Sequence, residues 1–327
     1  MRLKIFITGI YRSGTTLVSR ILNNHSQLWV TYDSVHFMRF CYDRYNPISR
    51  KEKTEALVKE LHTRLAKRWN MTFNIEKIMS DICTLSDLTY RGIYEIIMEA
   101  LATQYKQKTD GWGEKTNVCW GQIPNFLTMF PEGKIIHILR DPRDVMCSYK
   151  KMTYEPGYAY LDSAFASFHS FMSARNYLKD FSSESYCCLK YEDLVTKPVT
   201  TIKELCDFLR LDYEDSMLDV LSFSDKTGLQ IWDGESSFDK AFNEISKKPL
   251  DRWKNHDSRE DLFLVELINR PVMSEFGYEL SGIELQKDEW LRLYDILQGP
   301  FVNSRYNYWL RTGKGIEAYP SDPLKAF

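Results

Sequence analysis

The 327-residue sequence lacks the features that mark membrane proteins and nucleic-acid-binding proteins. No segment approaches the ~20 consecutive apolar residues that a helix needs to cross a bilayer. The 43 basic and 45 acidic residues give a net charge of −2, so there is no overall basic field and any anion site must be local. The first residues also show no apolar stretch with a cleavage site. We therefore expect a cytoplasmic protein that has no membrane span and does not bind nucleic acid.

The sequence also lacks the cysteine and histidine patterns of metal sites. Its seven cysteines are odd in number and scattered, and there is no CxxC pair or Cys/His cluster with the spacing of metal ligands. This use of cysteine is typical of a reduced compartment. We expect neither a disulfide framework nor a bound metal.

The third absence is a single lysine in the stretch GIYRSGTT, residues 9–16. Gly9 and Gly14 have the spacing of a nucleotide-binding phosphate loop, but Thr15 stands where a kinase has the lysine that bridges two phosphates. The loop separates a buried-strand pattern, LKIFIT, from the helical pattern TTLVSRIL, so its amides lie at a helix N-terminus, where an anion is favoured. Together with the Arg12 guanidinium, this loop suits a phosphosulfate, whose transferred group carries less charge than a γ-phosphoryl group and needs no metal.

Short buried strands alternate with helices along the rest of the chain. KIIHIL breaks at RDPRDV, and SYCCLKYEDL precedes the helical TTIKELCDFLRL. This alternation predicts an α/β fold with a central, mostly parallel sheet and helices on both faces. Residues 34–108 are mostly helical and are predicted to form an insertion. Ligands lie beyond the carboxyl ends of such strands, so GIYRSGTT, RDPRD and KYEDL should form the site.

Three stretches of the sequence resemble motifs of the sulfotransferases that use 3′-phosphoadenosine 5′-phosphosulfate (PAPS). IYRSGTTLVSRIL is similar to their 5′-phosphosulfate loop, IIHILRDPRDVMCSYKK to their 3′-phosphate-binding strand, turn and helix, and SSFDKAFNEISKKPLDRWKNH to the segment that closes over the nucleotide. The similarity is greatest to the branch that holds tyrosylprotein sulfotransferases and many bacterial members. It implies a P-loop-like three-layer fold, with a sulfotransferase domain at 1–280 and an aromatic-rich helical extension at 281–327.

The resemblance implies a reaction as well as a fold. A sulfuryl group would pass in line from PAPS to a hydroxyl or amine acceptor, releasing adenosine 3′,5′-bisphosphate without a metal. The acceptor stays open between a small molecule, a glycan and a peptide. The loop MTYEPGYAYLDSAF, with four aromatic residues, lies where relatives contact the acceptor. Packing of this loop on the helical insertion is the alternative.

The resemblance also assigns the nucleotide contacts. Arg140 at a strand end and Ser148 two turns into the next helix could both reach one terminal phosphate, which a guanidinium fork and a hydroxyl bind well. A salt bridge of Arg140 with Asp141 or Asp144 is the alternative. The other expected contacts come from the loop, a strand end and the late segment: Arg12, Ser13, Gly14, Thr15, Thr16, Tyr191, Lys248 and Arg252.

The catalytic base is assigned in the same way. Cytosolic members have a histidine after a Lys-Thr pair, where this chain has Asn117. In the tyrosylprotein branch a glutamate after the first helix serves instead, and that position falls on Asp33, a carboxylate able to take the acceptor's proton. His36 is the rival base. An N-cap of the following helix is the alternative role for Asp33.

Two further residues are expected at the leaving group. Lys115 matches a lysine that stabilises charge on the leaving phosphate, and a solvated surface lysine is its alternative. Ser237 matches a serine that assists the same oxygen, with Ser236 as a competitor. Two other functions remain open: a P-loop small-molecule kinase, which the missing lysine disfavours, and a catalytically inactive nucleotide-binding relative, which the presence of Arg12, Asp33 and Lys115 disfavours.

Overall fold

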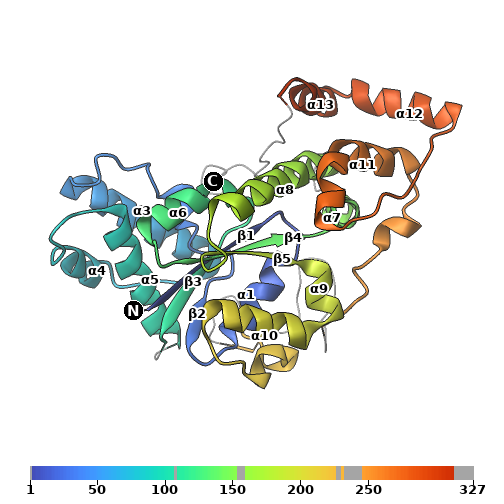
Figure 1. Ribbon diagram of the computed structural model, residues 1–327. Helices are drawn as coiled ribbons and strands as arrows, with labels where there is room; N and C mark the ends of the chain where they lie inside the picture. Colours follow the sequence, from blue (N-terminus) through green and yellow to red (C-terminus); the bar gives the residue numbers. More distant parts are fainter. Residues whose placement is uncertain (1, 107–108, 153–158, 226–229, 232–244, 313–327) are drawn as a thin grey trace.

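The centre of the molecule is a parallel β-sheet (Figure 1). The computed structural model describes residues 2–106, 109–152, 159–225, 230–231 and 245–312. Within them the strand order is β2-β3-β1-β4-β5, and every neighbouring pair is parallel. The strands are β1 (Leu3–Gly9), β2 (Leu28–Val30), β3 (Gly111–Lys115), β4 (Lys134–Leu139) and β5 (Tyr186–Lys190).

Helices cover both faces of the sheet because β1 sends apolar side chains to both. Phe6 points into one hydrophobic cluster, while its neighbours Ile5 and Ile7 point into another, and all three are fully buried. The Ile5 face is covered by α1 (Thr15–Asn23) and α10 (Pro198–Leu209), which follows the short α9 (Tyr191–Thr196). The predicted α/β fold with helices on both faces is confirmed.

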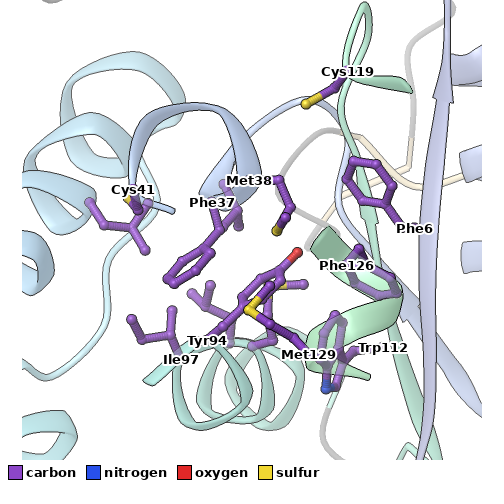
Figure 2. Close-up of a cluster of buried hydrophobic side chains, with 14 of the residues drawn as sticks. Phe6, Phe37, Met38, Cys41, Tyr94, Ile97, Trp112, Cys119, Phe126 and Met129 are labelled. Atoms are coloured by element: carbon purple, nitrogen blue, oxygen red, sulfur yellow. The ribbon is translucent and has the colours of Figure 1, made fainter. Parts of the chain in front are cut away.

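The Phe6 face packs against the predicted insertion. In its described part this stretch contains α2 (Phe37–Phe40), α3 (Lys51–Trp69), α4 (Ile75–Ile82) and α5 (Tyr90–Lys106), and α6 (Ile123–Met129) lies beside it. Figure 2 shows how the start of α2 is held in this cluster. The Phe37 ring stacks on the Tyr94 ring of α5 with a centroid distance of 4.0 Å, and Tyr94 packs against Trp112 of β3. Helix α5 of the insertion therefore holds α2 against the sheet.

A third hydrophobic cluster joins the second half of the chain. It includes residues of α7 (Pro142–Met152), α8 (Asp162–Asp180) and α11 (Arg259–Met273). The expected extension at 281–327 contains α12 (Lys287–Gln298) and α13 (Pro300–Thr312) in its described part. Leu293 of α12 and Val302 of α13 are buried in this cluster. No helix among the described residues has the length and apolar character to cross a membrane.

Short 3-10 turns complete the described elements. They are Trp120–Gln122, Ala159–Leu161, Asp215–Leu218, Val220–Ser222, η5 (Arg252–Asn255) and Ser274–Phe276.

Candidate active site

The loop at Ile10–Gly14 joins β1 to α1 at the carboxyl end of the sheet. Ser13 closes its turn, since its Oγ donates to the Ile10 carbonyl at 2.7 Å and its N–H to the same oxygen at 3.2 Å. Gly14 occupies the N-cap of α1 with φ +97°, a left-handed conformation that glycine adopts without strain. No side chain caps this helix, so its first-turn N–H groups face the loop, the arrangement that favours an anion.

Arg140 and Tyr191, from the ends of two other strands, pack against this loop. A Cβ on Gly14 would lie 2.4 Å from the Tyr191 ring, and the Arg140 guanidinium stacks on the same ring at 4.4 Å from its centroid. Arg140 Nη1 donates to the Arg12 carbonyl at 2.7 Å, and Nη2 donates to the Pro249 carbonyl at 2.6 Å. Arg140 therefore ties the loop to the late segment of the chain.

The alternative role of Arg140, a salt bridge with Asp141 or Asp144, is not formed among the described residues. Asp141 instead pairs with Arg143, at 2.6 Å between Oδ2 and Nη2, and caps α7 by accepting the Arg143 N–H. Asp144 accepts two backbone amides of the late segment. The Arg140 Nε is buried and has no hydrogen-bond partner in the described part of the chain, so a buried donor at this strand end is unused.

The two expected phosphate sites are adjacent. Arg12 Nε donates to Ser148 Oγ at 2.9 Å, which joins the loop after β1 to the second turn of α7. Arg12 has φ +69°, so its side chain leaves the loop from a left-handed residue. A guanidinium from the loop and a hydroxyl from α7 thus face the same region.

Asp33 lies in a polar cluster that also contacts the start of α1. Its Oδ2 is 3.4 Å from Lys115 Nζ and accepts the Asn117 Nδ2–H at 3.2 Å, and its Oδ1 is 3.5 Å from His36 Nε2. Asn117 in turn accepts the Thr15 hydroxyl at 2.6 Å. This chain of contacts connects the phosphate loop to the expected base.

Backbone contacts explain why these side chains meet. The segment after β3 continues beside β1, with the Thr116 N–H on the Ile7 carbonyl and the Val118 N–H on the Gly9 carbonyl, both at 2.9 Å. This pairing places Asn117 over the start of α1. The Lys115 N–H donates to the Thr31 hydroxyl at 3.0 Å, which brings the residues after β2 to the end of β3.

The structure contradicts two alternatives that the sequence left open. Lys115 is not a solvated surface lysine, since its side chain is 2% exposed. Asp33 does not cap α2, because the N-cap residue is His36 and the Phe37 N–H donates to Glu114 Oε2 at 3.2 Å. Asp33 is itself left-handed, with φ +66°, and its carboxylate faces Lys115 instead.

Sequence reasoning did not identify Glu114. It is fully buried on β3 and accepts hydrogen bonds from the hydroxyls of Tyr94 and Thr116 as well as from Phe37 N–H. Burial raises the pKa of Glu114 from 4.5 to about 7, although these hydrogen bonds lower it. The sequence signal that could have identified Glu114 is its charge, because an acidic residue inside a buried strand needs hydrogen-bond partners. It also directly precedes Lys115.

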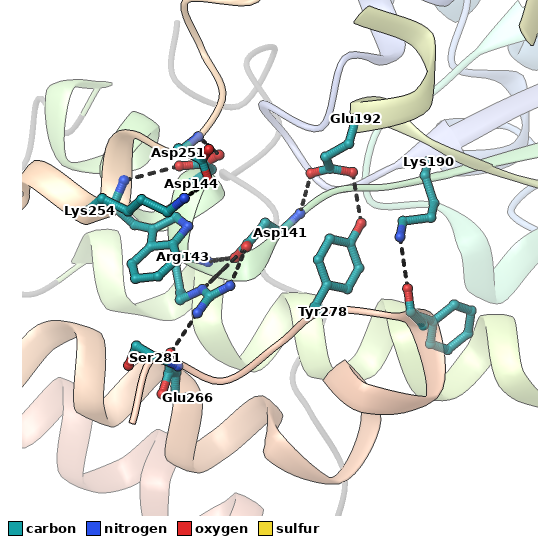
Figure 3. Close-up of polar contacts among 12 residues, drawn as sticks. Asp141, Arg143, Asp144, Lys190, Glu192, Asp251, Lys254, Glu266, Tyr278 and Ser281 are labelled. Carbon is teal, nitrogen blue, oxygen red and sulfur yellow. Dashed lines mark hydrogen bonds and ion pairs between the residues drawn. The ribbon is translucent and has the colours of Figure 1, made fainter. Parts of the chain in front are cut away.

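The late segment supplies the remaining expected contacts. Lys248 is exposed, and Arg252 is half-buried with its Nε 3.4 Å from the Lys248 carbonyl. Figure 3 shows this segment beside the start of α7, where Asp144 contacts Asp251. Ser237 and Ser236 lie outside the described residues.

The acceptor loop is described from residue 159 onward. Phe165 is fully buried in the third hydrophobic cluster, and the Tyr160 hydroxyl donates to Asp261 Oδ2 at 2.8 Å. The alternative that this loop packs on the helical insertion is therefore wrong for these two residues, since they pack on α11. Neither ring is open for stacking on an acceptor in this arrangement.

Comparison with known proteins identifies the family. The model of the sulfotransferase family matches residues 4–215, about two thirds of the chain, and this region includes Arg12, Asp33, Lys115 and Arg140. The chain belongs to the sulfotransferase family. It is therefore a sulfotransferase enzyme, as the resemblance implied.

Relatives of this sulfotransferase agree with that assignment. A Caenorhabditis briggsae protein named "Putative protein-tyrosine sulfotransferase" is 25% identical over 290 residues, which cover 85% of this chain and 90% of the relative. The sulfotransferase domain from the curacin biosynthetic pathway aligns with a TM-score of 0.55 at 22% identity, over 86% of this chain and 99% of that domain. The sulfotransferase domain of the Synechococcus PCC 7002 olefin synthase aligns with a TM-score of 0.53 at 19% identity, over 84% and 94%. The two structures share the fold of this chain.

Proposed function

We propose that this sulfotransferase takes its sulfuryl group from PAPS and transfers it to a hydroxyl acceptor. The observation that carries the proposal is the meeting of three elements at one edge of the sheet: the lysine-free loop, Arg140 and Ser148. Arg12 Nε on Ser148 Oγ and Arg140 Nη1 on the Arg12 carbonyl join them. A nucleotide with a phosphosulfate at one end and a separate 3′-phosphate needs two adjacent anion sites of this kind.

The residues present fit such a nucleotide. The backbone N–H groups of Ser13, Gly14, Thr15 and Thr16 would hold the 5′-phosphosulfate at the N-terminus of α1, with the Thr16 hydroxyl beside them. Arg140, whose buried Nε has no partner among the described residues, and Ser148 would hold the 3′-phosphate. Tyr191 would support the loop, since its ring packs directly against Gly14. Lys248 and Arg252 would cover the phosphates from the late segment.

The chemistry would be carried by the Asp33 cluster. Asp33 takes the proton from the acceptor hydroxyl as that oxygen attacks sulfur, and the bond between sulfur and the bridging oxygen breaks. Negative charge then develops on the leaving phosphate, where Lys115 and Arg12 stabilise it. Ser237 is assigned to the same bridging oxygen by resemblance alone. His36, at 3.5 Å from Asp33, is the alternative base.

The acceptor is proposed as a hydroxyl of a small molecule, a glycan or a peptide. The name of the C. briggsae relative makes a tyrosyl peptide one member of any acceptor panel. A P-loop kinase is less well supported, because Thr15 stands at the position of the phosphate-bridging lysine and its hydroxyl is hydrogen-bonded to Asn117.

Nucleotide choice tests the proposal directly. Adenosine 3′,5′-bisphosphate should stabilise the folded protein by about 3 kcal/mol at a hundredfold excess over its dissociation constant, and ATP with magnesium should stabilise it far less. Thermal unfolding with each nucleotide measures this. Transfer of labelled sulfuryl from PAPS to a pool of hydroxylated acceptors then separates an active enzyme from an inactive relative. Stronger stabilisation by ATP would contradict the proposal.

A further inference from the structure

Asp144 connects the late segment to the rest of the molecule through both of its carboxylate oxygens (Figure 3). Its Oδ2 accepts the Asp251 N–H at 2.9 Å, and its Oδ1 accepts the Trp253 N–H at 3.1 Å. The Asp144 side chain is buried, whereas Asp251 and Lys254 on the segment are exposed. Asp251 has φ +56°, so the backbone turns sharply at the point where Asp144 binds it.

Neighbouring contacts fix the same turn of the segment. The Trp253 ring packs against the Arg143 guanidinium at 3.7 Å from the ring centroid, and Arg140 donates to the Pro249 carbonyl. Arg143 is itself held by Asp141 and by Glu266 of α11. Arg140, two residues before α7, and the first turn of α7 thus bind the segment at several points, and Asp144 accepts two of the hydrogen bonds.

The position of Asp144 on α7 needs an explanation, because it lies one turn before Ser148. Residues four apart lie on the same face of a helix, so a carboxylate stands beside the proposed 3′-phosphate site. An unpaired carboxylate there would repel a phosphate. Two backbone N–H groups directed at its oxygens offset this charge and form charge-assisted hydrogen bonds.

We propose that Asp144 is a positioning residue for nucleotide binding. By holding the amides of Asp251 and Trp253, it keeps residues 247–255 in the conformation in which Lys248 and Arg252 can reach the nucleotide phosphates. Asp144 does not itself touch the nucleotide. This inference rests on the proposed function, since the ligand is the same.

The test compares Asp144→Asn with the native protein by titration of adenosine 3′,5′-bisphosphate. Asparagine keeps the size but offers one acceptor oxygen and turns an NH2 group toward the second amide. The dissociation constant should rise about 10- to 100-fold, as expected for the loss of a hydrogen bond to a charged group. Turnover at saturating PAPS should stay within about threefold of native, and hydrogen exchange at residues 251 and 253 should accelerate. Asp219→Asn is the control, because Asp219 also accepts a backbone amide, that of Leu221, in another part of the chain.

A double variant separates positioning from a merely structural role. If Asp144 acts through the segment, Asp144→Asn combined with Arg252→Ala should bind the bisphosphate little worse than Asp144→Asn alone. Fully additive losses, or native affinity in Asp144→Asn, would overturn the inference even if the variant melts at a lower temperature. Failure of the native protein to bind the bisphosphate would instead contradict the proposed function.

Discussion

Asp33 and Lys115 form the ion pair at the centre of the candidate active site. The two side chains meet because the residues after β2 and the end of β3 are joined by the Thr31 hydroxyl. Asn117 supports the same carboxylate oxygen from the direction of the phosphate loop. A carboxylate held in this way can take a proton only from an acceptor hydroxyl that comes within hydrogen-bond distance of it, so these contacts determine the direction from which the acceptor must approach.

The residue-scale prediction concerns the base. Asp33→Asn keeps the size of the side chain but removes the carboxylate, so turnover should fall by about 10²- to 10⁴-fold. Single-turnover sulfuryl transfer measures the effect, and bisphosphate affinity should hardly change. The melting temperature should fall, because the buried Lys115 ammonium loses a carboxylate partner. His36→Ala serves as the comparison and should retain more activity. A nearly native Asp33→Asn beside an inactive His36→Ala would reverse the assignment.

At the scale of elements, the start of α2 depends on a buried acid. Glu114 of β3 accepts the Phe37 N–H, while the Phe37 ring stacks on Tyr94. Since Asp33 and His36 lie in the turn directly before α2, these contacts hold the turn against the sheet.

Glu114 also predicts a dependence of stability on pH. Because burial raises its pKa from 4.5 to about 7, the folded state binds a proton more tightly than the unfolded state. The corresponding stabilisation is complete below about pH 4.5 and is lost as the pH rises through about 7. In Glu114→Gln the free energy of unfolding should therefore fall less between pH 5 and pH 8, by about 1–3 kcal/mol. Urea unfolding at four pH values measures this, and equal pH slopes in the two proteins would contradict it.

The elements also show how far the sequence could predict the structure. Continuous apolar runs identified β1, β4 and β5, and the glycine loop between β1 and α1 was predicted from its residue types alone. The three-residue β2 has too short a pattern to stand out. Helix α8 was not predicted, because its start was assigned to the loop that contacts the acceptor, although Phe165, Phe168 and Met172 recur at helical spacing.

The candidate site was only partly predictable, because only some of its residues lie in local sequence motifs. Arg12, Arg140 and Ser148 lie in local motifs, so the sequence places them at the loop and the strand end. The Asp33–Lys115 pair, Glu114 and the role of Asp144 depend on contacts between residues about 80 to 110 positions apart. Local patterns contain no information about such pairings, and the fold alone brings them together.

At the scale of the whole molecule, a buried ion cluster joins the sheet to the C-terminal helices. Arg143 at the start of α7 contacts Asp141 and also Glu266 of α11, at 2.7 Å between Nη1 and Oε1. Arg143 and Glu266 are both buried. Glu266 Oε1 also accepts the Ser281 N–H, so one carboxylate oxygen joins three parts of the chain.

Removal of this carboxylate should be costly. Glu266→Ala leaves the Arg143 charge buried with one partner fewer, which should lower the free energy of unfolding by about 3–5 kcal/mol. Lys77→Ala breaks the exposed Lys77–Asp81 pair and should change it by about 0–1 kcal/mol. Chemical denaturation of both variants measures the difference, and similar losses in the two would show that burial of the cluster is not important.

The central position of β1 has a consequence for how the protein is made. Leu3 pairs with Gly111 and Ile5 pairs with Lys134, so β1 leaves the ribosome more than 100 residues before these partners do. At ~5–20 residues per second, the ribosome needs on the order of ten seconds to deliver them. During that interval the apolar strand β1 and the loop after it have no neighbouring strands to pair with, so the nascent chain exposes apolar surface before its nucleotide site can form.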